Sequence, residues 1–166
     1  MKRILVIGCP GSGKSTLTRR LSEKLSLPAV HLDALFWEPG WKEASREDFD
    51  KRLADALSKP KWIIDGNFNR TIAARLAKCD TVIWLDYPRR TCICGVLRRV
   101  FSNYGKVRAD MGAGCPERLD LSFLKYVWDF GKTDVPKIRE KLKHIDARVL
   151  IFKNRRQTER FIKEEL

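Results

Sequence analysis

Long hydrophobic runs are missing from this 166-residue sequence. The longest apolar run near its start covers Ile4 to Ile7, which is too short for the core of a secretion signal or for a membrane span. Internal repeats and low-complexity tracts are absent as well. With 43% hydrophobic and 33% charged residues, the composition is that of a chain able to bury a sizeable core. We therefore predict a single domain over residues 1–166, cytoplasmic and without a membrane partner.

A regular cysteine pattern is also missing. The five cysteines are an odd number, and Cys92 and Cys94 have no second pair at the spacing that a zinc site requires. Free cysteines of intracellular proteins are usually packed as small hydrophobic side chains. We therefore predict reduced, mostly buried thiols.

Acidic residues are outnumbered throughout and absent between Tyr87 and Ala109. The chain has 34 basic and 21 acidic residues, which gives a formal net charge of +13. The acid-free stretch contains these basic residues: Arg89, Arg90, Arg98, Arg99, Lys106 and Arg108. Such a surplus indicates an anionic partner, either the phosphates of a small molecule or a nucleic-acid backbone, and a merely solvated basic face is the remaining alternative.

Short apolar runs alternate with amphipathic segments along the chain. Runs typical of buried strands cover residues 3–8, 29–32, 62–65, 81–86 and 148–152. Helices are predicted over residues 14–26, 45–57, 71–78, 90–104 and 121–130. Another helix is predicted to end at about residue 144, and a last one covers residues 156–165. An aromatic-rich loop is expected over residues 36–41, and Ser45 with Asp48 resembles a capping box. This alternation predicts a three-layer α/β/α fold around a parallel sheet.

The segment after the first predicted strand matches the phosphate-binding pattern G-x-x-x-x-G-K-[ST] without a deviation. Glycines let such a loop turn its backbone N–H groups toward phosphates, and the following helix points its positive dipole end at the same anion. We predict that Lys14 bridges the β- and γ-phosphates of ATP and that Ser15 binds Mg²⁺. The predicted nucleotide contacts here are Gly8, Pro10, Gly11, Ser12, Gly13, Lys14, Ser15 and Thr16.

Three carboxylates follow predicted strands, whose carboxyl ends converge on the crevice of such a sheet. Asp65 and Asp86 are alternative second ligands for Mg²⁺, and Asp65 is preferred because Gly66 gives it a tight exit turn. Asp33 precedes a group of aromatic residues that includes Trp37. These rings either stack an acceptor molecule or fill a small subdomain, and the sequence favours neither. Asp33 is also a candidate to position or deprotonate an acceptor hydroxyl.

Several arginines are candidates for stabilising a phosphoryl group in transfer, because fixed positive charge offsets the negative charge that develops there. The candidates are Arg70, Arg89, Arg98 and Arg99. The adjacent Arg98 and Arg99 are preferred as catalytic residues because they lie beside a glycine-rich segment. For any single arginine, an ordinary surface position is the alternative.

Taken together, several segments resemble the bacterial DNA topology modulation proteins, a branch of the adenylate-kinase-like P-loop kinases. The matching segments are 8–16, 31–33, 62–67, 97–99 and 114–118. The resemblance implies a P-loop NTPase fold with a five-stranded parallel sheet in the order 2-3-1-4-5 and a helical lid over about residues 101–132. It also implies that Asn154 and Arg155, after the last strand, lie beside the adenine of ATP.

Adenylate kinases carry an Asp-Gly-Phe-Pro-Arg segment where this chain has Asp65-Gly-Asn-Phe-Asn-Arg70. The proline is missing and the arginine sits one residue later, which favours a hydroxyl acceptor over a nucleoside monophosphate. The acceptor contacts expected from these considerations are Asp33, Trp37, Asp65, Asn67 and Arg70.

The leading functional hypothesis is an ATP- and Mg²⁺-dependent phosphotransferase that acts on a small acceptor, such as a nucleoside or nucleotide. The alternative is a nucleic-acid-associated regulatory ATPase that uses the basic surface. No helix-turn-helix or other nucleic-acid module is recognisable, which weakens that alternative. A GTPase switch is disfavoured because no Asn-Lys-x-Asp guanine motif is present.

Overall fold

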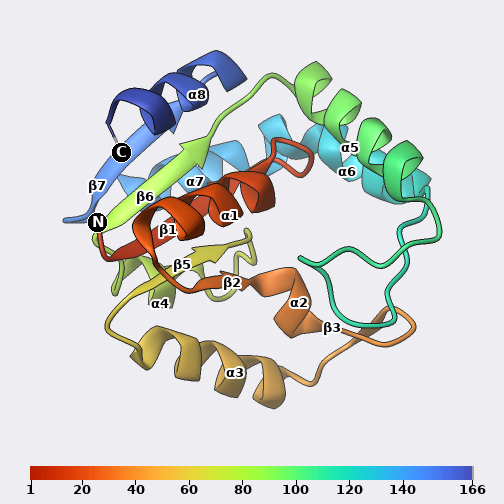
Figure 1. Cartoon of the computed structure of the whole chain (residues 1–166), viewed down its shortest axis with the longest axis horizontal. Coiled ribbons are helices and arrows are strands. Elements are labelled where there is room, and N and C mark those ends of the chain that lie inside the picture. Colours follow the sequence, from red (N-terminus) through yellow and green to blue (C-terminus); the bar gives the residue numbers. More distant parts are fainter. Residues whose placement is uncertain (166) are drawn as a thin grey trace.

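The computed structural model describes residues 1–165 and contains a five-stranded parallel sheet (Figure 1). The sheet is formed by β1 (Arg3–Gly8), β2 (Ala29–His31), β5 (Trp62–Asp65), β6 (Thr81–Leu85) and β7 (Arg148–Phe152). The strand order is β2-β5-β1-β6-β7, which is the order 2-3-1-4-5 for these five strands. The three-layer α/β fold and the strand order predicted from the sequence are therefore confirmed.

The apolar composition of β1 explains its central position. Leu5 pairs with Ile64 of β5 on one side and with Val82 of β6 on the other, and all three side chains are buried. When helices cover both faces of a strand, the side chains on both faces are buried, so the sequence of the strand is continuously apolar. The buried side chains around β1, β5 and β6 form one hydrophobic cluster.

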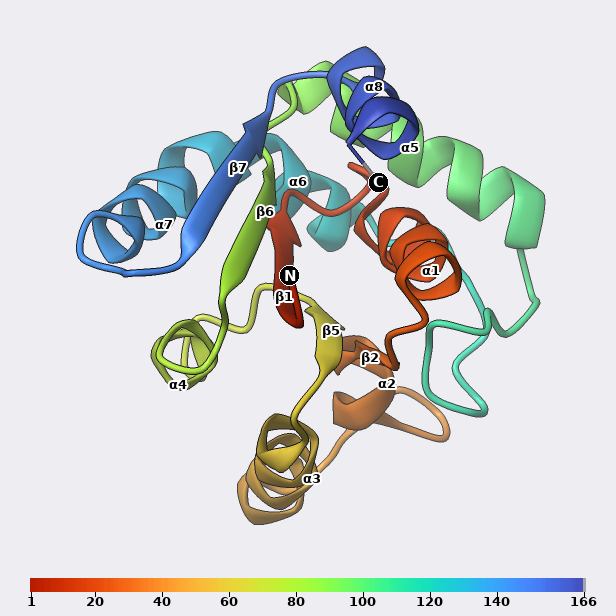
Figure 2. The same cartoon turned by 60° about the vertical axis from the view of Figure 1, so that its left-hand side comes forward.

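Helices cover both faces of the sheet (Figure 2). On one side lie α1 (Lys14–Leu25) and α8 (Arg155–Glu164); on the other lie α3 (Arg46–Ser58), α4 (Ile72–Leu76) and α7 (Val135–Leu142). Two further helices, α5 (Arg89–Asn103) and α6 (Leu121–Thr133), pack against each other beyond the carboxyl end of β6. Ser45 caps α3 by accepting from the Asp48 amide, as the capping-box pattern predicts.

The segment between β2 and α3 differs from the predicted loop. It contains the short helix α2 (Leu32–Phe36) and an antiparallel hairpin of β3 (Trp37–Glu38) and β4 (Lys42–Glu43). Because β2 ends at His31, Asp33 lies in the first turn of α2 and not at the end of the strand. The aromatic side chains of this region pack on one another, which gives the hairpin a local apolar base.

Residues 104–120, called the strap here, connect α5 to α6 and contain two isolated β-bridges. The strap lies against the β3–β4 hairpin. Gly40 N donates to Gly114 O at 2.9 Å, and the Trp41 indole donates to Pro116 O at 3.2 Å. The expected lid over residues 101–132 thus consists of the end of α5, an irregular strap and α6. Within residues 1–165, no helix is long and apolar enough to cross a membrane.

Candidate active site at the phosphate loop

The loop between β1 and α1 has the backbone geometry of an anion cradle. Gly13 caps α1 with a φ of 95°, and no side chain bonds the first amides of that helix. These amides are therefore available to an anion, which the helix dipole also favours. Gly11 has a φ of 79°, and a Cβ there would come within 2.1 Å of the Cys92 carbonyl oxygen in α5. The loop therefore needs glycine both for its turn and for its contact with α5.

Lys14 begins α1 and lines the main cavity. Its Nζ donates to the carbonyl oxygens of Gly8 at 2.9 Å and Cys9 at 3.1 Å. Burial lowers the pKa of Lys14, and the nearby carboxylates of Asp65 and Asp33 act in the opposite direction. A partly buried ammonium group thus lies beside the loop that the sequence predicts to bind phosphates.

The main cavity has a volume of about 870 Å³, within the range of small-ligand sites. Its walls come from the phosphate loop, the carboxyl ends of β2 and β5, helices α2, α5 and α6, the strap, and Arg155 at the start of α8. These are the positions at which open parallel sheets usually bind ligands.

Two carboxylates and one imidazole lie on the β2–β5 side of this cavity. The buried Asp65 carboxylate is bonded to His31 Nδ1 at 2.8 Å. Burial lowers the pKa of His31, but the hydrogen bond and charge of Asp65 outweigh it, and the net direction is upward. Asp33 opens into the cavity; desolvation by the surrounding protein and the charge of Asp65 raise its pKa, against the effect of Lys14.

Asn67 braces the phosphate loop. Its Oδ1 accepts from the Gly8 amide at 3.1 Å, and its Nδ2 donates to the Gly8 carbonyl at 2.9 Å. Although Asn67 lines the cavity, these two bonds occupy the side chain that the sequence predicts to contact an acceptor. The backbone after β5 is fixed in turn by the fully buried Arg75, which donates to the carbonyls of Gly66 and Phe68. Burial lowers the pKa of Arg75 to about 9.

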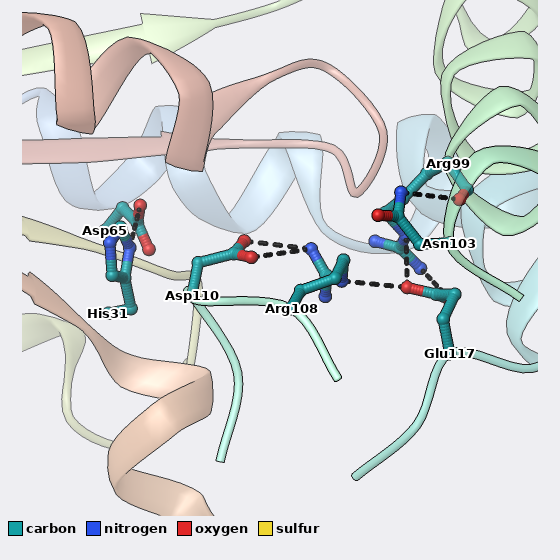
Figure 3. Close-up of polar contacts among 7 residues, drawn as sticks. All are labelled: His31, Asp65, Arg99, Asn103, Arg108, Asp110 and Glu117. Carbon is teal, nitrogen blue, oxygen red and sulfur yellow. Dashed lines mark hydrogen bonds and ion pairs between the residues drawn. The ribbon is translucent and has the colours of Figure 1, made fainter. Parts of the chain in front are cut away.

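Arginines of α5 and the strap form the opposite wall (Figure 3). Both arginines singled out as catalytic candidates, Arg98 and Arg99, line the cavity. Arg99 pairs with the buried Glu117, which also pairs with Arg108 of the strap. Arg108 in turn donates to Asp110.

Asp110 brings the strap close to the phosphate loop. Desolvation raises the pKa of Asp110, but the charge of Arg108 and the nearby Ser15 hydroxyl outweigh it, so the net direction is downward. The predicted magnesium ligand Ser15 is therefore within reach of a carboxylate of the strap.

Besides Gly8 and Ser12 of the phosphate loop, four predicted site residues do not line this cavity: Arg70, Asp86, Arg89 and Asn154. Arg70 forms a two-pronged ion pair with Asp50 on the surface, with bonds of 2.9 and 2.6 Å, so the geometry does not support its predicted contact with an acceptor. The side chain of Asn154 caps α8 by accepting from the Gln157 amide, whereas its neighbour Arg155 lines the cavity. Asp86, the alternative magnesium ligand, bonds Lys153 instead. Of the two alternatives, only Asp65 is brought to the phosphate loop.

The aromatic residues after Asp33 serve as packing and as cavity wall at once. Phe36 contacts Trp37 with ring centroids 5.0 Å apart and also packs against Phe68. All three rings line the cavity, and two rings of α6, Phe123 and Tyr126, line it as well. Both roles considered for these aromatics are thus compatible with the structure.

Sequence reasoning assigned no role to His31, Arg75, Arg108, Asp110, Glu117 and Tyr126. One signal was present for the strap carboxylates: Asp110 and Glu117 are the first acids after the acid-free stretch. They are also the acids that pair with its arginines. Nothing in the sequence around Arg75 indicates that it turns back to residues 66–68.

Comparison with known proteins gives two kinds of similarity. The chain is 28% identical over 106 residues to an adenylate kinase of Thermosipho africanus, covering 62% of this chain and 48% of that protein. It is 31% identical over 96 residues to an adenylate kinase of Mycobacterium leprae, covering 52% of this chain and 48% of the relative. The chain thus spans about half the length of the curated relatives it matches.

Solved structures share the fold. A shikimate kinase of Acinetobacter baumannii, in complex with shikimate, matches with a TM-score of 0.63 at 17% identity, over 99% of this chain and 90% of that one. The shikimate kinase of Bacteroides thetaiotaomicron matches with a TM-score of 0.59 at 16% identity, over 99% and 95%. A family profile described as AAA domain matches residues 4–94, more than half of the chain, including β1, the phosphate loop and α1. Because this match covers more than half of the chain, the chain belongs to the AAA domain family.

Proposed function

We propose that this protein is a phosphotransferase that moves the γ-phosphoryl group of ATP to a hydroxyl group of a small acceptor. The observation that carries the proposal is the meeting, in one cavity, of the phosphate loop with Lys14, a carboxylate at Asp33 and a wall of arginines. Phosphoryl transfer needs mainly positioning and stabilisation of negative charge, which these groups supply.

The donor half of the site is the phosphate loop and α1. The backbone amides at the start of α1 would hold the phosphates of ATP, and Lys14 would place its positive charge between the β- and γ-phosphates. Arg155 lies at the same cavity and would contact the nucleotide from α8. Arg98 and Arg99 would meet the γ-phosphoryl group on the side facing α5.

Magnesium fits this donor set. Ser15 and Asp65 both line the cavity, and an oxygen donor set is the one that Mg²⁺ prefers. No cluster of three His, Cys, Asp or Glu side chains able to hold a metal occurs in residues 1–165, so the protein would supply few ligands, with water and phosphate oxygens as the others. Bound there, the ion would neutralise phosphate charge.

The acceptor half is formed by α2, the end of β5 and α6. A hydroxyl acceptor must lose its proton during transfer, and Asp33 is a carboxylate of the cavity that lies near Lys14. The raised pKa of Asp33 makes it a better proton acceptor than an ordinary aspartate. The only predicted acceptor cation, Arg70, is held by Asp50 outside the cavity. This favours a hydroxyl over a phosphate group as the acceptor.

The experiment that tests the proposal measures ADP release with a panel of nucleosides, nucleotides and hydroxyl-bearing metabolites, in the wild-type protein and in Lys14→Ala. We expect the substitution to lower turnover by about 100-fold or more, because one fixed charge on a transferring phosphoryl group is worth that much. Lys51→Ala, on the exposed face of α3, is the matched control and should leave turnover unchanged. Full turnover in Lys14→Ala would contradict the kinase proposal.

We also propose that the protein belongs to the branch of the DNA topology modulation proteins, which several segments of its sequence resemble. The segments that carry this resemblance supply the phosphate loop, Asp33, Asp65, Arg99 and Glu117, all of which meet at or beside the cavity. Such a branch would share the phosphotransfer machinery, and its name describes no chemical step.

A further inference from the structure

Glu117 is a buried carboxylate whose backbone is fixed independently of its side chain. Only 5% of its surface is exposed. Its amide donates to Lys106 O and its carbonyl accepts from Gly105 N, both at 2.9 Å. These bonds already attach the last part of the strap to the turn that follows α5. The carboxylate is therefore not needed to anchor the strap, and its burial calls for another explanation.

Two guanidinium groups share this carboxylate. Glu117 Oε2 lies 3.0 Å from Arg99 Nε and 2.8 Å from Arg108 Nε, and Oε1 accepts from Arg99 Nη2 at 3.2 Å. Figure 3 shows Arg108 between Glu117 and Asp110, the latter accepting from Nη1 of Arg108. Among residues 1–165, no hydrogen bond or ion pair occupies Nη1 of Arg99.

Without Glu117, the two arginines would repel each other in a partly buried place. Desolvation by burial and the charge of Arg108 both lower the pKa of Arg99, and Glu117 counteracts them. Removing the central carboxylate would leave two neighbouring cations with no shared counter-ion, which is costly away from water. Their long side chains would then turn toward solvent, since arginine has the reach to do so.

We propose that Glu117 is a positioning residue: it holds the guanidinium groups of Arg99 and Arg108 together at the cavity wall, where they meet the transferring phosphoryl group. The inference rests on the proposed phosphotransfer. It adds a residue that contacts neither ATP nor the acceptor. Glu117 pairs with Arg99 through Nε and Nη2 and with Arg108 through Nε, which leaves Nη1 of Arg99 to face an anion. Asp110 is the carboxylate that a phosphate would displace from Arg108.

The central test is Glu117→Gln, which keeps the size of the side chain and removes its charge. Because the arginines act on the transition state, we expect kcat to fall by about 10-fold or more and KM for ATP to change by less than about threefold. The same substitution in an Arg99→Ala/Arg108→Ala background should change kcat by less than about twofold, since Glu117 then has no arginines to place. Thermal unfolding of each variant is measured alongside.

Glu159→Gln is the matched control. Glu159 also forms a two-pronged pair with an arginine, Arg20, but on the surface and away from the cavity. This substitution should leave kcat and KM at the wild-type values. Glu117→Asp keeps the charge on a shorter side chain, and we expect its kcat to lie between those of the wild type and Glu117→Gln. If Glu117→Gln does not fold, a kcat loss in Glu117→Asp at unchanged KM supports the inference.

The outcomes separate the two proposals. Wild-type kcat in Glu117→Gln, or in Glu117→Asp where only that variant folds, would overturn the inference while leaving the phosphotransferase proposal intact. An equal loss of kcat in the arginine-free background would also overturn it, because Glu117 would then act without the arginines. If the wild-type protein neither binds nor turns over ATP, the proposed function itself fails and the inference falls with it.

Discussion

At the residue scale, the electrostatics of the cavity is set by charges that come from distant parts of the sequence. Asp33 lies beside Lys14 and Asp65, and these neighbours shift its pKa in opposite directions. Together with desolvation the net shift is upward, so the pKa of this carboxylate lies above the ordinary value for aspartate. A raised pKa is typical of a carboxylate used as a base.

We predict that Asp33→Asn lowers kcat by about 100-fold or more with little change in ATP affinity, because it keeps the shape of the side chain and removes the base. In the wild type, kcat should fall as the pH drops through the pKa of Asp33, which lies above the ordinary value of 3.8. This acidic limb should be absent in the variant. The measurement is a pH profile of kcat together with ATP titration.

Asp50→Asn is the control for this experiment, because Asp50 pairs with Arg70 on the surface outside the cavity. Its pH profile should match that of the wild type. Wild-type transfer by Asp33→Asn, or a nucleoside monophosphate as the preferred acceptor, would contradict the role of Asp33 as a base.

The phosphate loop is a residue-scale feature that local spacing encodes, so its sequence pattern predicts its geometry. The network of the opposite wall is different. Arg99 and Glu117 are 18 positions apart and meet because the strap folds back on the end of α5. Neither residue stands in a pattern that specifies the other, so their pairing is not predictable from spacing.

At the scale of elements, the strands of the parallel sheet were predictable, whereas the β3–β4 hairpin and the contacts between non-sequential elements were not. Continuous apolar runs predict β1, β5, β6 and β7, whose bounds differ from the expected ranges by at most one residue. The hairpin of β3 and β4 has two residues in each strand, too few to show an alternating pattern. The hairpin is held instead by the strap, whose carbonyl groups at Gly114 and Pro116 accept hydrogen bonds from it.

The packing of the phosphate loop on α5 leads to an element-scale prediction at Gly95. A Cβ at this position would lie 2.0 Å from the Gly11 carbonyl oxygen, so Gly95→Ala must push α5 away from the loop. Although alanine favours a helix by about 1 kcal/mol, we expect the variant to unfold at a lower temperature and to bind ATP about 10-fold more weakly or worse. Thermal unfolding and ATP titration measure both effects.

Gly131→Ala in α6 is the matched control, since a Cβ there meets nothing within 4 Å. Helix propensity should raise its unfolding temperature by a few degrees and leave ATP binding unchanged. If Gly95→Ala behaved in the same way, close packing of α5 on the phosphate loop would not be needed for nucleotide binding.

At the scale of the whole molecule, the net charge of +13 is unevenly placed. Many surface cations have an acidic partner nearby, as in the pairs Arg20–Glu159, Arg52–Glu38, Arg70–Asp50 and Arg160–Glu164. The acid-free stretch contributes Arg98, Arg99 and Arg108 to the cavity wall, where Arg99 and Arg108 pair with carboxylates of the strap. Part of the basic charge thus lies at the cavity, where phosphates would bind.

This placement leads to a prediction that separates the kinase proposal from a nucleic-acid-dependent ATPase. We expect duplex DNA to bind only through the general attraction of a basic protein, so that affinity falls by about 10-fold or more between roughly 50 and 200 mM salt. ATP consumption should be the same with and without DNA, because the arginines of the cavity would contact the nucleotide and not the DNA. Binding is measured by salt titration, and turnover by ADP release. Stimulation of ATP consumption by DNA at the higher salt concentration would favour the regulatory ATPase instead.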